Sequence, residues 1–188
     1  REVGIPIAIY RPGRLTGHSQ HGTSNASDLL DNLIQTCVRL GAAPDLDLLV
    51  DMVPVDFASA ALVRLSLRPE SLGKTFHLGH PRPIPWHDLV SALTSFGYPL
   101  RQLPYEAWTA AVRHYATHRQ DGRAALSVGG LSLAELRESL IAQYDCSATL
   151  EALAVAGVQP PAIGPSVLRA GFRYLMKSGL LHAPQETR

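Results

Sequence analysis

The sequence has few of the residues and patterns that mark several common protein classes. Only two of its 188 residues are cysteine, which excludes a disulfide-rich secreted scaffold and a four-cysteine zinc site. The longest apolar runs, such as Leu48–Val50 and Ala60–Val63, are too short to span a membrane. Lysine and arginine (17) nearly balance aspartate and glutamate (16), for a net charge of +1. We therefore expect no nucleic-acid or membrane partner, and a reducing, cytoplasmic location.

Several motifs for metal, serine-nucleophile and phosphate chemistry are also absent. The patterns HExxH, GxSxG, GxGxxG and the Walker motif do not occur in the sequence. The eight histidines include two close pairs, His18 with His21 and His77 with His80. Neither pair has a carboxylate at a ligand-like spacing, so we predict no metal site.

What is present is enough apolar sequence for a globular core. Hydrophobic residues make up 46% and charged residues 18%, with a mean hydropathy of +0.03. The run Ile5–Tyr10 is short, β-branched and apolar on both faces, which is typical of a strand buried in a parallel sheet. Such a strand needs neighbours on both sides, and no sequence before it supplies them. We therefore expect the C-terminal part of a larger α/β domain.

Apolar periodicity and capping residues predict the remaining elements. The expected strands cover residues 48–53, 75–78 and 100–103. The expected helices run from a cap at Asn25 or Ser27 to 40, and over 56–67, 85–97, 105–118, 132–144, 145–157 and 165–177, with a surface loop at 119–130. Residues 1–130 are thus predicted to end a Rossmann-type sheet with few short parallel strands and to bind substrate. Residues 131–188 are predicted to form a helical C-terminal subdomain.

The densest group of candidate functional residues follows the first strand. Ligands of open α/β sheets bind at the carboxyl ends of strands, which is where the segment Arg11–Gln20 begins. Gly13 and Gly17 allow a ligand to approach the backbone closely, and Arg14 adds a charge. A solvated loop built from turn residues would have the same composition, so position leaves both interpretations open.

Four stretches resemble one family in their order and spacing. They are IAIYRPGRLTG at 7–17, DMVPVDFA at 51–58, TFHLGHP at 75–81, and Asp145-Cys146-Ser147 with Leu150. Together they resemble the C-terminal part of the thioester reductase domains of nonribosomal peptide and polyketide synthetases. These domains are extended short-chain dehydrogenase/reductases, and the resemblance covers essentially the whole chain.

The resemblance implies NADP-dependent reduction of an acyl or peptidyl thioester, carried on the phosphopantetheine arm of a carrier protein, to an aldehyde or alcohol. The family's catalytic Tyr-x-x-x-Lys pair and its GxxGxxG loop are missing here: Glu70 stands four residues before Lys74, and Arg173 before Lys177. In the family both precede the strand that opens this sequence. We therefore predict no catalytic residue in this chain, no activity without the upstream Rossmann part, and weak or no NADP binding by the chain alone.

The resemblance also assigns binding residues. Those that would border the nicotinamide through backbone groups are Arg11, Pro12, Gly13, Arg14, Leu15, Thr16 and Gly17. Those that would line the substrate channel are His18, Ser19, Gln20, Met52, Val53, Pro54 and Phe57. Asp56 is expected in the first turn of a helix rather than in catalysis. The helical tail would shape the entry for the pantetheine arm and the docking face for the carrier protein.

Two alternatives stay open at this stage. The chain could be a noncatalytic module that docks a carrier protein, because it lacks the catalytic pair. It could also be a fragment of another extended reductase, such as a nucleotide-sugar epimerase, which shares the motif at 51–58. The helical tail after residue 131 fits that second alternative less well.

Overall fold

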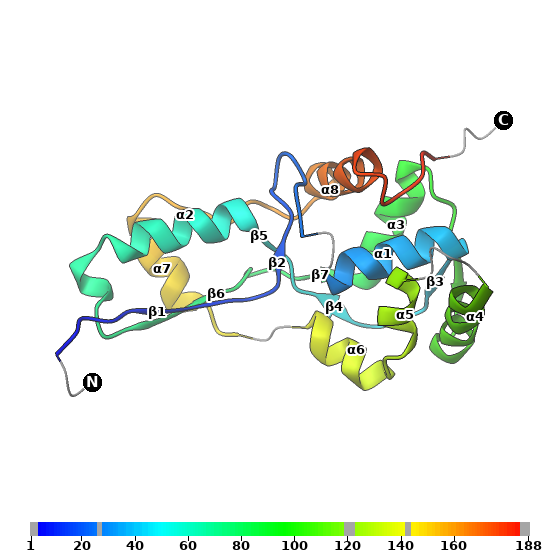
Figure 1. Ribbon diagram of the computed structural model, residues 1–188. Coiled ribbons are helices and arrows are strands. Elements are labelled where there is room, and N and C mark those ends of the chain that lie inside the picture. Colours follow the sequence, from blue (N-terminus) through cyan, green and yellow to red (C-terminus); the bar gives the residue numbers. More distant parts are fainter. Residues whose placement is uncertain (1–3, 26–27, 119–122, 142–143, 185–188) are drawn as a thin grey trace.

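Two hydrophobic cores organise the chain (Figure 1). The structure, a computed structural model, describes residues 4–25, 28–118, 123–141 and 144–184. The elements of the smaller core lie at the left of Figure 1 and most helices at the right, which gives the molecule an elongated outline.

The smaller core is built on one parallel strand pair. β1 (Ile9–Pro12) pairs with β6 (Thr75–Leu78), and α2 (Val55–Ser66) and α7 (Ser147–Val155) pack beside this pair. A short 3-10 helix, Pro69–Ser71, leads into β6. The buried apolar residues of this core are Val53, Phe57, Ala58, Ala61, Leu65, Phe76, Leu78 and Leu153.

Six helices surround the larger core. They are α1 (Leu29–Leu40), α3 (Trp86–Phe96), α4 (Tyr105–His118), α5 (Arg123–Gly129), α6 (Leu133–Leu140) and α8 (Pro165–Lys177). A parallel pair, β3 (Ala42–Pro44) with β8 (Arg101–Leu103), closes one end. The indole N–H groups of Trp86 and Trp108 donate to carbonyls of β3, at 2.8 and 3.0 Å, and so satisfy two buried polar groups.

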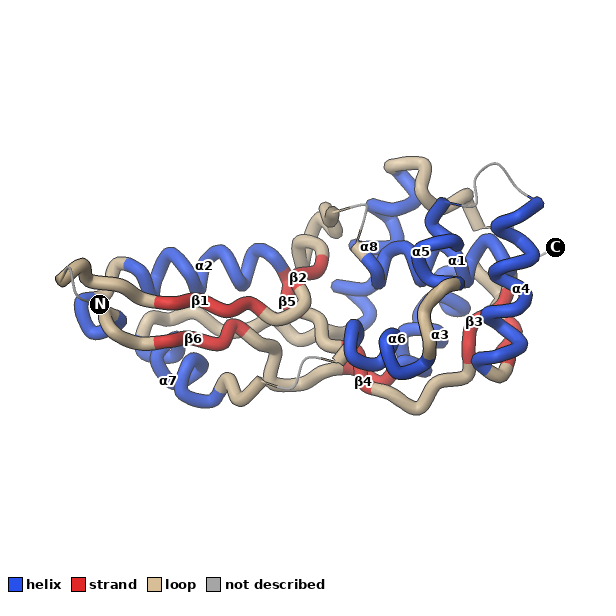
Figure 2. The backbone as a smooth tube through the Cα atoms, turned by 60° about the horizontal axis from the view of Figure 1, so that its bottom comes forward, coloured by secondary structure: helices blue, strands red, loops and turns tan. Residues whose placement is uncertain are grey.

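Two further strand pairs lie between the cores (Figure 2). β2 (Leu15–Thr16) runs parallel to β5 (Val53–Pro54), and β4 (Leu49–Val50) is antiparallel to β7 (Ile84–Pro85). The predicted α/β class with few short parallel strands is confirmed, with this one antiparallel pair added. No helix among the described residues is both long and apolar enough to cross a bilayer.

The start of α1 corrects one prediction. Its N-cap is Asp28, whose carboxylate accepts from the Leu30 N–H at 2.8 Å, and not Asn25; Ser27, the other predicted cap, lies outside the described residues. The end of the helix was predicted correctly. Gly41 takes a left-handed conformation with φ of 65° and donates to the carbonyls of the last turn.

The prediction of a buried first strand is wrong for this chain. β1 begins at Ile9 rather than Ile5, and Ile5, Ile7 and Ile9 are 66%, 51% and 44% exposed. The reason is that β1 has one partner, β6, among the described residues, so its other edge and the apolar side chains beside it stay open.

Two predicted boundaries near the C-terminal third also need correction. Part of the expected surface loop at 119–130 is α5, with Ala125 and Val128 buried; residues 119–122 lie outside the described part. The helix expected at 132–144 ends at Leu140, although its predicted capping box between Ser132 and Glu135 is present.

The three helices of the tail do not share one core. α6 and α8 contribute to the larger core, together with α1 and α3, whereas α7 packs with α2 and β6 in the smaller one. The boundary at residue 130 stays a prediction, and the hydrophobic cores divide the chain differently. α6 and α8 thus lie on one side of the segment that follows β1, and α7 lies on the other.

Candidate functional site

A pocket lies where the segment after β2 meets α1 and α8, and we call it the α1–α8 pocket. β2 and the start of the following loop form one wall through Leu15, Thr16, Gly17 and His18. The other walls are mostly apolar and come from Leu30, Ile34, Met52, Leu89, Val167, Leu168, Phe172 and Leu175. Polar residues gather on one side: Ser24, Asn25, Asp28 and Asp31. The pocket is small, about 50 Å³, and combines an apolar interior with a polar wall.

Residues 17–25, here called the pocket loop, are tied at one end to the smaller core. The backbone N–H and the hydroxyl of Ser19 donate to the two carboxylate oxygens of Asp56 on α2, at 2.9 and 2.6 Å. Burial acts to raise the pKa of Asp56, but the two hydrogen bonds from Ser19 outweigh it and the pKa is lowered. Asp56 lies in the first turn of α2, as predicted. Because its pKa is lowered, the ionised form of Asp56 anchors the pocket loop.

The other end of the pocket loop rests on α8 through a glycine. Gly22 has a φ of 70°, and a β-carbon there would overlap the carbonyl of Ala170. Within the loop, Gly22 N–H donates to the His18 carbonyl at 2.8 Å, and a β-carbon at Gly17 would lie 2.5 Å from the Gly22 oxygen. Glycine is thus required where the loop backbone touches itself and α8.

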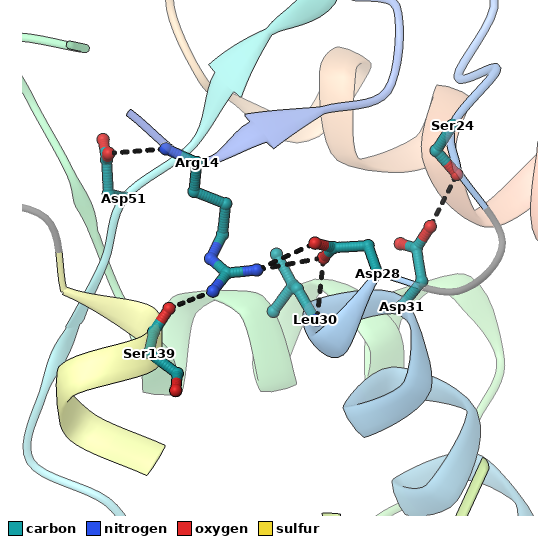
Figure 3. Close-up of polar contacts among 7 residues, drawn as sticks. All are labelled: Arg14, Ser24, Asp28, Leu30, Asp31, Asp51 and Ser139. Atoms are coloured by element: carbon teal, nitrogen blue, oxygen red, sulfur yellow. Dashed lines mark hydrogen bonds and ion pairs between the residues drawn. The ribbon is translucent and has the colours of Figure 1, made fainter. Parts of the chain in front are cut away.

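Arg14 joins three elements beside the pocket (Figure 3). Its Nη1 donates to both carboxylate oxygens of Asp28, at 3.1 and 2.9 Å, and its Nη2 donates to the carbonyl of Ser139 at the end of α6. Its backbone N–H donates to Asp51 at 3.3 Å, and its carbonyl accepts from Val53 N–H at 2.8 Å. Both terminal nitrogens and both backbone groups of Arg14 are therefore used inside the chain, whereas its buried Nε has no hydrogen-bond partner among the described residues.

Gly13 is held against a buried carboxyl. A β-carbon at Gly13 would lie 2.5 Å from Oδ2 of Asp51. Burial raises the pKa of the Asp51 carboxyl, against the hydrogen bond from the Arg14 N–H. This contact gives Gly13 a packing role within the chain, in addition to the cofactor contact that the family resemblance implies.

Asp31 also lines the pocket and, among the described residues, forms no ion pair. Its Oδ2 accepts from the hydroxyl of Ser24 at 2.5 Å, as Figure 3 shows. Burial raises the pKa of Asp31 to about 6, and the nearby Asp28 adds to the increase. The Ser24 hydrogen bond and, least of all, the charge of Arg14 act in the opposite direction.

The raised pKa of Asp31 makes a stability prediction. The pKa of the Asp31 carboxyl is higher in the folded than in the unfolded protein. Its protonated form therefore stabilises the fold at a pH below the unfolded pKa, and this contribution to stability is lost as the pH rises through about 6. Asp31→Asn is therefore expected to stabilise the protein by about 2–3 kcal/mol at pH 8 and by almost nothing at pH 4. Urea unfolding at both pH values measures the difference.

Asp88 provides the matched control. It is also the third residue of its helix, α3, but is exposed. Asp88→Asn should change stability by less than about 0.5 kcal/mol at either pH. A gain for Asp31→Asn of equal size at pH 4 and pH 8 would contradict an origin in ionisation.

The structure brings some of the predicted site residues together and separates others. Leu15, Thr16, Gly17, His18 and Met52 line the α1–α8 pocket. Of the other predicted substrate residues, Ser19 contacts Asp56, Gln20 is exposed, Val53 and Phe57 lie in the smaller core, and Pro54 is the buried cap of α2.

The sequence did not indicate that part of the polar wall, or the helix predicted at 165–177, would line this pocket. Ser24, Asp28 and Asp31 were not singled out, although Asp31 lies three residues before Ile34 on the edge of the apolar face of α1. Phe172 and Leu175 of α8 are buried in the larger core and also line the pocket. No group of three or more His, Cys, Asp or Glu in the described residues could hold a metal ion.

Comparisons with known proteins agree on one family. A model of NAD-binding domains described as male sterility protein matches residues 1–62. A linear gramicidin synthase from Brevibacillus parabrevis is 33% identical over 189 residues, which cover 100% of this chain and 4% of that protein. The crystal structure of the terminal R domain from the myxalamid PKS-NRPS biosynthetic pathway is 36% identical with a TM-score of 0.88, over 98% of this chain and 47% of that one.

A further solved structure supports the fold. A thiolation-reductase di-domain from an archaeal nonribosomal peptide synthetase has a TM-score of 0.74 at 24% identity, over 94% of this chain and 37% of that one. The chain thus spans about half or less of the solved reductase structures that it matches. Because sequence and fold similarity both run along nearly its whole length, the chain belongs to the family of reductase domains of nonribosomal peptide and polyketide synthetases, of which it spans about half of one domain.

Proposed function

We propose that this chain is the substrate-binding part of an NADP-dependent terminal thioester reductase. The complete domain would release a carrier-bound acyl or peptidyl thioester as an aldehyde or an alcohol. The observation that carries the proposal is the α1–α8 pocket, which adjoins the segment after β1 and whose apolar walls suit the end of an acyl chain. The similarity to synthetase reductase domains supports the reaction class.

The cofactor would lie against the segment from Arg11 to Gly17. Arg11, Pro12 and Leu15 are exposed there, and the buried hydroxyl of Thr16 has no hydrogen-bond partner in the described structure. These residues fit one wall of a nicotinamide site, with Arg14 holding the segment in place. When bound, the cofactor supplies the hydride. The sequence has no glycine-rich diphosphate loop, so this chain's part is to position the cofactor and the acyl chain.

A dinucleotide-binding Rossmann part of the same protein would cover the open side of β1. Apolar side chains are exposed along β1 and on α2, where Leu62 and Val63 are 43% and 52% exposed. An unpaired strand edge beside apolar side chains favours pairing with a further strand. Such a strand would also bring the family's Tyr-x-x-x-Lys pair to the site.

Turnover tests the proposed function directly. The complete domain should oxidise NADPH only when an acyl-pantetheine thioester is present, and should form the matching aldehyde or alcohol. Carrier binding without any reduction would favour the noncatalytic docking module instead. Turnover with NADH at the same kcat/KM as with NADPH would overturn the cofactor assignment, and conversion of a nucleotide sugar would favour an epimerase.

The proposed partner is an acidic carrier protein with a phosphopantetheine arm. Arg169, Arg173 and Lys177 are exposed, recur every four residues and form one stripe on α8, which also forms a wall of the pocket. Reversing Arg169 and Arg173 to glutamate should raise KM for a carrier-bound substrate about 3- to 10-fold, because charge steering acts on association. KM for a free pantetheine thioester should not change.

The control for this prediction reverses two exposed arginines elsewhere, Arg82 and Arg101. That double variant should keep the KM of both substrates. The effect of the stripe should also shrink as salt is added, since salt screens exposed charges. Equal changes for carrier-bound and free thioesters would contradict a docking role.

A further inference from the structure

We propose that Asp31 makes the α1–α8 pocket selective for acyl chains that carry a protonated amine near their end. This inference rests on the proposed function, because it names the substrate class of the same site. It depends on where Asp31 lies, on which charges surround it and on an unused hydroxyl in the pocket wall.

The first argument is position. Asp31 projects from the first turn of α1 into a pocket whose α8 wall is formed by uncharged residues, among them Val167, Leu168 and Phe172. Ser24, on the pocket loop, donates to Oδ2 of Asp31 at 2.5 Å. The carboxylate is thus fixed in orientation at the edge of a small apolar space, about 50 Å³, that the end of a chain would fill.

The second argument is charge. The cation near Asp31 is Arg14, but its Nη1 contacts both oxygens of Asp28 and its Nη2 contacts the Ser139 carbonyl. His18 also lines the pocket, and its Nδ1 lies 3.9 Å from Asp56. The ionised form of Asp31 therefore faces the pocket with a hydroxyl as its hydrogen-bond donor and with Asp28 as a second negative charge nearby.

The third argument is the chemistry that such a carboxylate favours. Burial makes the charged form of Asp31 costly, and an ammonium placed beside it would offset that cost while forming a charge-assisted hydrogen bond. An alkyl chain of the same length would remove water from the carboxylate without offering it a positive charge, which disfavours the ionised form. Thr16 Oγ1, which lines the same pocket and has no hydrogen-bond partner among the described residues, offers a second polar contact for a bound chain.

The test separates binding from turnover. Two pantetheine amides, in which an amide replaces the reactive thioester, are titrated into the complete domain by calorimetry. One acyl chain ends in a primary amine and the other, of equal length, in a methyl group. The amine ligand should bind more tightly at pH 8, and Asp31→Asn should weaken it about 10- to 100-fold while leaving or improving the methyl ligand.

Two controls make this a test of the charge of Asp31. The preference for the amine should fall below pH 6, as Asp31 takes up a proton. Asp31→Glu, which keeps the charge, should retain part of the preference, and Asp88→Asn, which removes an exposed acid at the same helix position, should retain all of it.

The outcomes are distinct. Equal affinity of the wild-type protein for both amides, or a preference that survives Asp31→Asn, overturns the inference even if the matching thioesters are reduced. Absence of NADPH-dependent reduction of both thioesters defeats the proposed function instead, and the amide titration still decides the role of Asp31.

Discussion

Gly22→Ala is expected to lower the free energy of unfolding by about 2–4 kcal/mol. The new β-carbon would overlap the Ala170 carbonyl, and alanine would have to hold a φ of 70°, which L residues rarely adopt. The backbone of α8 cannot move without disturbing Leu168 and Phe172 in the larger core. We therefore expect the pocket loop to detach from α8, with weaker ligand binding as a second effect. Guanidinium unfolding measures the first effect.

Gly73→Ala is the matched control for this prediction. Gly73 has a similar φ of 78°, but nothing lies within 4 Å of the position of its β-carbon. Its replacement should cost only the backbone strain, about 1 kcal/mol. If both variants lose the same stability, the contact with α8 contributes nothing and the loop is not held there by Gly22.

Arg14→Ala is expected to destabilise the protein by about 3–5 kcal/mol. The Arg14 side chain is 14% exposed, and its removal would leave the Asp28 carboxylate with the Leu30 N–H as its donor and the Ser139 carbonyl without the Arg14 donor. Unpaired, partly buried polar groups cost more than the hydrogen bonds contribute. Urea unfolding measures the loss, and the start of α1 and the end of α6, which Arg14 joins, should become more open to hydrogen exchange.

The neighbouring Arg11 serves as the control. It is exposed on β1, so Arg11→Ala should change stability by less than about 0.5 kcal/mol. An Asp28→Asn/Arg14→Ala double variant should also be less destabilised than the sum of the two single changes, because the partners act as a pair. Strict additivity would show that the ion pair contributes nothing.

Helix positions were the part of the fold most open to prediction from the sequence. The capping box at Ser132 and Glu135, the glycine at 41 and the proline at 165 all act locally, so each sets a helix end wherever the chain folds. β6 was predicted with its observed bounds because Thr75–Leu78 is a short apolar run ended by glycine.

Elements set by tertiary contacts were missed. β3 consists of Ala42, Ala43 and Pro44, which have little strand propensity; pairing with β8 and hydrogen bonds from two buried tryptophans hold it. α5 lies in the stretch 119–130 for which the sequence predicts a loop, yet Val128 is fully buried. In both cases the neighbours that fix the structure lie far away along the chain.

The candidate site shows the same limit. The sequence pointed to the segment after β1, since glycine and polar residues concentrate there, and five of the predicted residues do line one pocket. It could not show that the Arg14 guanidinium would donate to Asp28. Nor could it show that α8, near the other end of the chain, would form a wall of the pocket. Both depend on how the chain returns upon itself.

The pocket loop is fastened to each of the two cores, and this makes it a mechanical link. Ser19 ties it to Asp56 on α2, and Gly22 rests on the backbone of α8, only a few residues further along. Such a short span has little slack, so a rotation of one core against the other must pull on it and change the mouth of the pocket. Any segment that binds at the open edge of β1 would therefore change the shape of the α1–α8 pocket through the backbone of this one loop.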